Sequence, residues 1–276
     1  MNITLIYAYW PNQPFEMTWC DLPWALRDAG LPKRLSDEGH QVRESILMAE
    51  EVPPEELRSG FILARQIAEE VKTARERGEL AVVLCGSCAL GAMSTIAGLG
   101  SNVGVAWFDA HPDLNTPETT SSGLFDGMAL AVAAGLAWYG MAREHAGLTS
   151  PITLDKTALF GARDIDDAEQ ALIEMHGIPI ATSAAEINQR LAGTKSTYVH
   201  LDMDVHDALT VRTNTFAVPE GPSIERVRET LVAIDNLAAI AVTGFDPAAA
   251  DTAKASRVAV EHLLAIANEQ EDNRNR

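Results

Sequence analysis

The chain has 276 residues, and its 39 acidic side chains outnumber its 21 Lys and Arg, which gives a formal net charge of −18. This balance argues against nucleic acid or an anionic membrane as a partner, because phosphate groups are bound by clustered positive charge. With 47% hydrophobic and 22% charged residues, the composition is that of a globular protein. One large α/β domain is expected over residues 1–268.

Apolar runs rich in β-formers alternate with helical patterns, which is typical of βαβ units around a mainly parallel sheet. The segment 10–24 fits neither period and is predicted to be a packed loop, and the charged tail 269–276 is predicted to be disordered. In chain order, strands are expected at 3–7, 80–84, 104–108, 157–160, 197–201 and 238–242, and helices at 57–77, 124–136, 166–175, 223–237 and 255–268.

The cysteines and the uncharged stretch 80–108 help to predict the cellular compartment of the protein. Cys20, Cys85 and Cys88 are too few and too unevenly spaced for a disulfide framework, and residues 1–10 lack the basic region of a signal peptide. The stretch 80–108 is long enough to span a bilayer, but glycines and serines interrupt it, so we read it as strand, turn, helix, turn and strand. We therefore expect a cytoplasmic protein.

A first group of polar residues follows the predicted strand 104–108. Asp109, His111 and Asp113 alternate, and a period of two would place all three on one side of an extended segment. Carboxylates favour Mn or Mg, and imidazole extends the range to Fe, Co, Ni and Zn. Turn or helix-capping carboxylates beside a chance histidine are the alternative.

A second group follows the strand 197–201. Asp202 and Asp204 share one face there, and their charges would repel each other unless a cation lay between them. With the first group they supply five ligands, enough for two metal ions that share carboxylates. His200, one residue before the end of the strand, is either an orienting residue for this group or a core histidine, and His206 is expected at the loop surface.

The third group, Cys85 to Cys88, follows the strand 80–84. A Cys-x-x-Cys pair between strand and helix is also what a thioredoxin-like redox site shows. Thioredoxin-like domains are much smaller than this chain, however, and a redox role would leave the two aspartate groups without a purpose. A metal-ligand role for Cys88 and inert buried thiols are the other two interpretations.

In order and spacing, these segments resemble the ureohydrolase family, which includes arginase, agmatinase, guanidinobutyrase and formimidoylglutamase. The family's Asp-Ala-His-x-Asp, Asn-Thr-Pro and Ser-Gly elements are matched from Asp109 to Gly127, and its Asp-x-Asp-x-x-Asp element is matched from Asp202 to Asp207. The resemblance implies a three-layer α/β/α sandwich around a mostly parallel, eight-stranded sheet. It also implies a homo-oligomer, trimer or hexamer.

The resemblance further implies a binuclear site for two divalent ions, most often Mn, in which a metal-bound hydroxide attacks an amidine-type carbon. Asp113 would accept a hydrogen bond from the hydroxide and pass a proton to the leaving amine, and Asp126 occupies the position of a proton-shuttling histidine. Asn115 and Ser122 match positions that hold substrate. The implied ligands are Cys88, Asp109, His111, Asp113, Asp202 and Asp204.

Four residues depart from the family pattern. Cys88 replaces a histidine, and a thiolate suits Zn or Fe better than Mn. Asp126 replaces the shuttling histidine, and Leu124 replaces an asparagine that helps to hold an α-carboxylate. Gly244 stands where arginase and agmatinase carry a guanidinium-binding glutamate, so Asp246 would have to turn inward to bind substrate.

These features predict a metal-dependent hydrolase of carbon–nitrogen bonds. Its substrate would be a small linear amidine, guanidine or hydroxyguanidine other than arginine. The alternatives are a non-catalytic or regulatory protein of the same fold with a degraded metal site, and a redox protein that uses Cys85 and Cys88.

Overall fold

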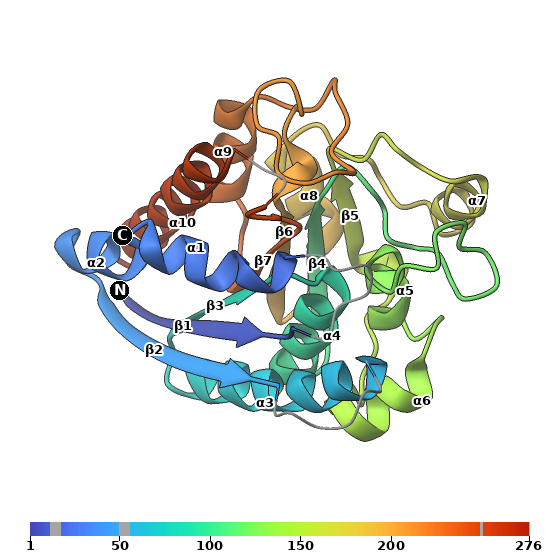
Figure 1. Cartoon of the computed structure of the whole chain (residues 1–276), viewed down its shortest axis with the longest axis horizontal. Helices are drawn as coiled ribbons and strands as arrows, with labels where there is room; N and C mark the ends of the chain where they lie inside the picture. The colour runs from blue at the N-terminus through green and yellow to red at the C-terminus, as the bar shows by residue number, and fades with distance from the viewer. Residues whose placement is uncertain (12–17, 50–55, 249–250, 276) are drawn as a thin grey trace.

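In the part of the chain that the structure describes, seven strands form one sheet in the order β2-β1-β3-β7-β6-β4-β5, and every neighbouring pair is parallel (Figure 1). The computed structural model describes residues 1–11, 18–49, 56–248 and 251–275. The strands are β1 (Asn2–Tyr9), β2 (Gln41–Met48), β3 (Leu80–Cys85), β4 (Val103–Phe108), β5 (Thr157–Phe160), β6 (Ser196–Asp202) and β7 (Leu237–Thr243).

Helices cover both faces of the sheet, so the expected three-layer α/β/α architecture is confirmed, with seven strands among the described residues. Successive strand residues point to opposite faces: Leu5 joins the core on one face and Ile6 the core on the other. The helices are α1 (Leu22–Asp28), α2 (Leu31–Asp37), α3 (Glu56–Glu76), α4 (Cys88–Leu99), α5 (Ala129–Ala133), α6 (Tyr139–Met141), α7 (Asp167–His176), α8 (Ala184–Leu191), α9 (Ile224–Val232) and α10 (Thr252–Asn275).

The central strands β3, β7, β6 and β4 are buried almost throughout, because helices cover both of their faces. β3, β7 and β4 are also almost entirely apolar, and this continuous apolar pattern made these three recognisable in the sequence. The edge strand β2 was not predicted, since Arg43 and Glu44 lie exposed on it and interrupt any apolar run. Charged side chains are usual on an edge strand, where they hinder pairing with another chain.

The carboxyl ends of the central strands meet at one edge of the sheet. Cys85 ends β3, Phe108 ends β4, Asp202 ends β6 and Thr243 ends β7, and these strands are direct neighbours. Ligand sites of open parallel sheets lie beyond this edge. The topology therefore brings together three polar segments that are far apart in the chain.

The structure differs from the sequence prediction at the end of the chain. α10 continues to Asn275, where a disordered tail was predicted from residue 269 on. The Glu271 carboxylate lies 2.8 Å from the amino terminus and 3.1 Å from His40 Nδ1, and Asn268 Nδ2 donates to Glu38 Oε2 at 2.7 Å. These contacts tie the charged end of the helix to the start of the chain.

The segment 10–24 lies partly outside the described residues, which omit 12–17. Trp10 and Trp19 are buried, and the ring of Trp24, in α1, stacks on Tyr7 at 6.0 Å between centroids.

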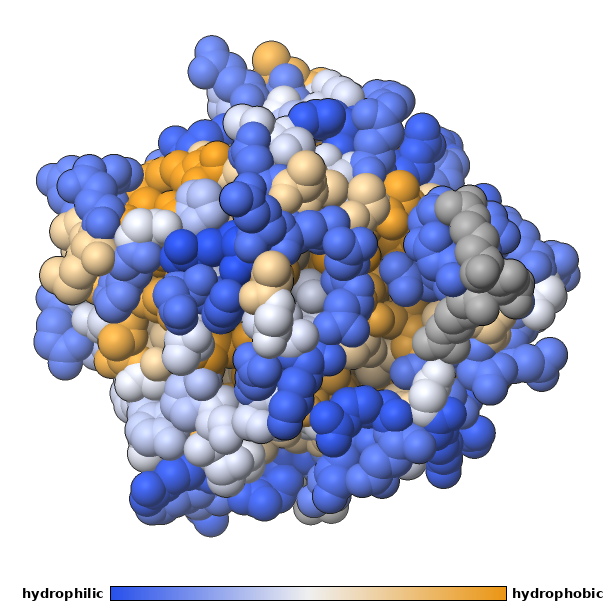
Figure 2. All heavy atoms as spheres, turned by 180° about the vertical axis from the view of Figure 1, so that it is seen from behind, coloured by the Kyte–Doolittle hydropathy of each residue, from blue (hydrophilic) through white to orange (hydrophobic). Residues whose placement is uncertain are grey.

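Within the described ranges, no helix has both the length and the apolar character needed to cross a membrane. The face seen in Figure 2 is largely hydrophilic, with hydrophobic side chains showing in smaller areas between the polar ones.

The close packing of α3 on α4 predicts that a larger residue at their contact would lower the stability of the fold. A Cβ at Gly98, in α4, would lie 2.5 Å from the Ala68 carbonyl oxygen and 2.6 Å from Val71 Cβ. Gly98→Ala should therefore lower the free energy of unfolding by about 1 to 3 kcal/mol through overpacking, measured by urea denaturation. Gly140→Ala, at a position where an added Cβ would meet no atom within 4 Å, is the control and should leave stability nearly unchanged.

Candidate metal and substrate site

A cavity of about 300 Å³ lies at the carboxyl ends of the central strands. Trp19, Leu124 and Phe216 contribute apolar surface, and Asn115, Ser121, Ser122 and Asn214 contribute neutral polar groups. The lining is otherwise strongly acidic: eight carboxylates face it, against one histidine, His111. They are Asp109, Asp113, Asp126, Asp164, Asp166, Glu169, Asp202 and Asp204.

The segment after β4 brings Asp109, His111 and Asp113 to this cavity, as predicted, although not through an extended backbone. Asp109 Oδ1 accepts a hydrogen bond from the His111 amide at 2.7 Å. Asp113 has φ +52°, a left-handed conformation, and its carbonyl accepts from the amides of Leu130 and Ala131. This turn leaves Asp113 Oδ2 buried with no hydrogen-bond partner in the described part of the chain. An unpartnered buried carboxylate oxygen is costly unless a cation binds it.

The segment after β6 supplies Asp202 and Asp204. Asp202 Oδ1 accepts from the Asp204 amide at 2.8 Å, and its Oδ2 accepts from the Cys88 thiol at 3.0 Å. Asp204 Oδ1 accepts from the Ala110 amide at 3.2 Å, which links the ends of β6 and β4. The two aspartates therefore hold fixed orientations toward the cavity.

Cys88 is the first residue of α4, and its sulfur faces Asp202 and Thr243. Burial raises the pKa of Cys88 well above that of a free thiol and raises the pKa of Cys85 to about 12. Cys85 does not line the cavity, and both cysteines are free thiols. A redox dithiol needs an accessible thiol of lowered pKa, so the structure argues against that interpretation.

Asp126 lines the cavity beside the N-terminus of α4. Its Oδ1 accepts hydrogen bonds from the Ser87 hydroxyl and from the Ala89 amide, the latter at 3.2 Å. These two residues flank Cys88 in sequence. The carboxylate thus caps the helix and fixes the backbone that carries the thiol.

The buried carboxylates shift one another's ionisation. Burial, together with the charge of Asp204, raises the pKa of Asp109 to about 7, and burial likewise raises the pKa of Asp113 and Asp202. Burial opposes ionisation of Asp204 as well, but hydrogen bonds from His111 outweigh it and lower the Asp204 pKa. A cation at this place would favour the ionised form of Asp109, Asp113 and Asp202, against the burial and the mutual repulsion that raise their pKa values.

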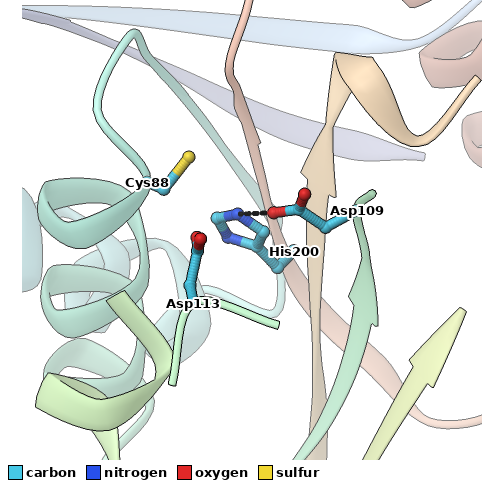
Figure 3. Close-up of side chains that lie close together, drawn as sticks. All are labelled: Cys88, Asp109, Asp113 and His200. Carbon is cyan, nitrogen blue, oxygen red and sulfur yellow. Dashed lines mark ion pairs between the residues drawn. The ribbon is translucent and has the colours of Figure 1, made fainter. Parts of the chain in front are cut away.

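Five of the six predicted metal ligands fall into two groups of possible ligand atoms, in each of which all atoms lie within 4.8 Å of one another, and Asp202 belongs to neither group. One group consists of Cys88, Asp109, Asp113 and His200 (Figure 3), and the other of Asp109, His111 and Asp204. His111 Nδ1 lies 3.4 Å from both Asp109 Oδ1 and Asp204 Oδ2. Carboxylate, imidazole and thiol groups that converge in this way, with one buried oxygen unpartnered, fit a pair of divalent transition-metal ions.

Asn115 and Ser122, the predicted substrate-binding residues, line the cavity, but Asp246 does not. Asp246 Oδ1 instead accepts from the Thr18 hydroxyl and from the Ala248 amide. The inward turn that the sequence interpretation required of Asp246 is therefore absent from the described structure. Its carboxylate stabilises the loop after β7.

Gly244 has φ +65°, and a Cβ at this position would overlap the Asp202 carboxylate. Its carbonyl accepts from Asn214 Nδ2 at 2.7 Å, and the same amide group donates to Asp204 Oδ2 at 3.2 Å. Asn214 therefore connects this loop to a predicted metal ligand. Glycine here leaves room for Asp202.

Several site residues were not singled out from the sequence. Asn214 and Phe216 come from a loop without periodicity, which gave no signal. Asp166 and Glu169 form a capping box at the start of α7, and the spacing of a capping box is visible in a sequence. Glu169 Oε1 also accepts from the Leu114 amide at 2.9 Å, so this helix start supports the segment that carries Asp113.

His206 was expected at the surface, and this expectation is wrong. The residue is fully buried, its Nδ1 lies 2.9 Å from the Met203 carbonyl, and its Nε2 lies 2.9 Å from Nε2 of His262 in α10. The loop after β6 folds back under α10, and the sequence of the loop alone could not reveal that contact.

A sequence model of the arginase family matches residues 23–267, so the chain belongs to the arginase family. Arginase of Bacillus subtilis (strain 168) is 34% identical over 171 residues, which cover 58% of this chain and 57% of that protein. An N(omega)-hydroxy-L-arginine amidinohydrolase of Streptomyces lavendulae is 28% identical over 212 residues, 74% of each chain. The alignment with the B. subtilis protein thus spans less than two thirds of its length.

Solved structures agree on the fold. Arginase from Bacillus cereus superposes with a TM-score of 0.87 at 23% identity, covering 96% of this chain and 97% of that one. Formimidoylglutamase from B. subtilis superposes with a TM-score of 0.73 at 17% identity, covering 98% of this chain and 87% of that one. The arginase family is metal-dependent, and the two ligand groups lie where its motifs were recognised in this sequence.

The raised pKa of His111 predicts how the stability of the metal-free protein depends on pH. Burial disfavours its charged form, but hydrogen bonds to Asp109 and Asp204 outweigh burial and raise its pKa. Above its ordinary pKa of about 6.5 the unfolded chain loses this proton while the folded chain keeps it, so stability falls as pH rises, by up to about 1.4 kcal/mol per pH unit. Urea denaturation between pH 7 and pH 9 should show this fall.

The raised pKa of Cys85 acts in the same direction toward the upper end of this range. Replacement His111→Asn should reduce the slope, and the exposed-site control His176→Asn should not. Stability that rises from pH 7 to pH 9 in the metal-free protein would contradict a raised pKa for His111.

Proposed function

We propose that the chain is a metal-dependent hydrolase that cleaves a carbon–nitrogen bond of a linear amidine, guanidine or hydroxyguanidine, and that arginine is not its substrate. The observation that carries this proposal is the pair of ligand groups that share Asp109 in an acidic cavity. The relatives support a hydrolase, and one of them is named for hydroxyarginine.

The proposed cofactor is two divalent ions. Mn suits the oxygen-rich ligands, and the Cys88 sulfur also suits Zn or Fe. When bound, the two ions would lower the pKa of water and so supply a nucleophile near neutral pH. The residues proposed to hold them are Cys88, Asp109, His111, Asp113, Asp202 and Asp204.

The charge of the cavity supports a cationic substrate. Asp164, Asp166 and Glu169 lie along the wall contributed by the start of α7 and the loop before it. A guanidinium is planar and cationic and donates several hydrogen bonds, which such carboxylates accept. Asn115 and Ser122 add neutral hydrogen-bonding groups, and we propose that they orient the rest of the substrate.

Proton transfer is assigned to two carboxylates. Asp113 Oδ2 is buried and unpartnered within the described residues, so it is placed to accept a proton and release it to the departing amine. Asp126 is proposed as the relay toward solvent. Its Oδ1 accepts hydrogen bonds from the Ser87 hydroxyl and the Ala89 amide, and these bonds position the carboxylate next to Cys88.

Three positions support the exclusion of arginine. Gly244 offers no charge, Asp246 is turned away from the cavity, and Leu124 presents an apolar side chain to it. The charged groups of an α-amino acid would therefore meet fewer polar side chains in this cavity than they meet in arginase, according to the family resemblance. A buried charge without a partner costs several kcal/mol.

The experiment that tests this function combines metal analysis with a substrate panel. Protein purified without a metal-binding tag is expected to hold two transition-metal ions per chain, and to hydrolyse at least one of Nω-hydroxyarginine, agmatine, guanidinobutyrate and formimidoylglutamate faster than arginine. Loss of activity with a chelator and its return with Mn should accompany this. Protein that binds no such ion, or that is inactive on every amidino compound, would falsify the proposal.

Asp113→Asn tests the assigned proton transfer. The variant keeps the size of the side chain, and asparagine tolerates a left-handed backbone, so the fold should persist while kcat falls by about 100-fold or more. Steady-state kinetics with the best substrate measure this effect. Asp235→Asn, which changes an exposed aspartate outside the cavity, is the control and should keep kcat.

The two buried cysteines provide a matched pair of variants. Cys88→Ser should lower metal content, whereas Cys85→Ser, three residues earlier and outside the cavity, should not. Elemental analysis of both proteins measures the difference. The opposite ranking would favour a role for Cys85 and weaken the metal-site interpretation.

A non-catalytic protein is the second candidate, and the Cys88 thiol favours it: in the described structure the thiol donates a hydrogen bond to Asp202, itself a proposed ligand. In that case Cys88→His would gain an ion that the native chain lacks. Two ions in the native chain, together with turnover, would exclude this candidate.

The proposal also covers compartment and assembly. Three free cysteines support a reducing, cytoplasmic location, and the net charge of −18 opposes binding to nucleic acid. A homo-oligomer, trimer or hexamer, follows from the family resemblance alone. Light scattering at several protein concentrations would decide its size.

A further inference from the structure

His200 lies in β6 and is fully buried next to the ligand groups. It pairs across the sheet with Trp107 of β4, and the two rings stack with centroids 3.6 Å apart and planes 6° apart. Strand register and ring stacking together fix the plane of the imidazole ring. The ring is therefore rigidly presented, as a metal ligand or a strong hydrogen-bonding group must be.

One ring nitrogen of His200 faces the cluster drawn in Figure 3. Its Nε2 lies 3.9 Å from Asp109 Oδ2, and the ligand atoms of Cys88, Asp109, Asp113 and His200 are all within 4.8 Å of one another. A separation of 3.9 Å is too long for a hydrogen bond. It is, however, within the limit of about 4.2 Å for two atoms that each lie about 2.1 Å from the same ion.

The other ring nitrogen has the partner that a metal-bound histidine requires. His200 Nδ1 lies 2.8 Å from the hydroxyl of Tyr198, which is buried. Metal-bound histidines donate their second N–H to such a group, which fixes the tautomer. With Nδ1–H donated to the Tyr198 oxygen, the lone pair of Nε2 points to the cluster.

Thr243 is the competing partner, because its hydroxyl lies 3.2 Å from His200 Nε2. The same hydroxyl lies 3.4 Å from the Cys88 sulfur. When Cys88 gives up its proton to bind a metal, the Thr243 hydroxyl can donate to the thiolate. Nε2 is then released from Thr243, and the proton of the Cys88 thiol is released to solvent, as it is whenever a thiol binds a metal as thiolate.

We infer that His200 is itself a ligand of the ion held by Cys88, Asp109 and Asp113. This inference rests on the metal binding in the proposed function and adds a ligand that the motif does not contain. The resulting set of one sulfur, one nitrogen and carboxylate oxygens suits Zn, Fe or Co better than Mn. A chain that carries cysteine at position 88 thereby keeps an imidazole on that ion.

The test uses the native chain loaded with Co²⁺, which shifts the proton resonances of its ligands. Two paramagnetically shifted imidazole N–H signals are expected, one from His111 and one from His200. The His200 signal should persist longest in D₂O, because that ring is fully buried while His111 is a quarter exposed. A single shifted signal that disappears in His111→Gln overturns the inference.

Two variants supply a measurement that does not depend on turnover. His200→Gln is compared with His262→Gln, which changes another fully buried histidine in α10 that belongs to neither ligand group. The Kd for Co²⁺, from competition with a chelating dye, should rise at least tenfold in His200→Gln and less than threefold in His262→Gln. Circular dichroism verifies that both variants are folded.

The outcomes separate the inference from the function on which it rests. A native chain that binds no Co²⁺ contradicts both. Binding with an unchanged Kd in folded His200→Gln removes His200 from the ligand set and leaves the proposed hydrolase standing. If His200→Gln does not fold, the resonances of the native chain decide.

Discussion

The repulsion among buried carboxylates at the ends of β4 and β6 is the constraint on which the rest of the site depends. Asp109, Asp113, Asp202 and Asp204 lie together and are all buried, and four such charges are not stable there unless they are protonated or neutralised by cations. Without a metal, His111 and raised pKa values relieve part of the repulsion. Two divalent ions would relieve it more completely, so the same repulsion that destabilises the metal-free folded chain would favour the metal binding that we propose.

The surrounding scaffold holds these groups in place. Parallel pairing of β3, β7, β6 and β4 brings three segments to one edge of the sheet. The Asp126 carboxylate fixes the start of α4, Asn214 ties the loop after β7 to Asp204, and Glu169 of the α7 capping box holds Leu114, directly after Asp113. Because each contact comes from a different part of the chain, the geometry belongs to the whole fold and not to any one motif.

Within the arginase family this chain combines a retained ligand framework with an altered surrounding. The carboxylates and His111 stand at the motif positions, whereas four other positions differ from the family pattern. Cys88 bears on metal binding, Asp126 on proton transfer, and Leu124 and Gly244 on substrate binding. The acidic wall of Asp164, Asp166 and Glu169 still favours a cation.

The sequence by itself determined the fold class, the central strands and most of the residues that line the cavity, because short buried strands stand out in the sequence and these polar residues follow them directly. It could not show that Asp246 turns away, that His206 is buried under α10, that α10 extends through the charged tail, or that β2 forms the edge of the sheet. Each of these depends on a contact between residues far apart in the chain, such as Thr18 with Asp246 or Glu271 with the amino terminus. The approach of His200 to Cys88 and Asp113 was likewise decided only by tertiary structure, since strand pairing sets which side chains meet.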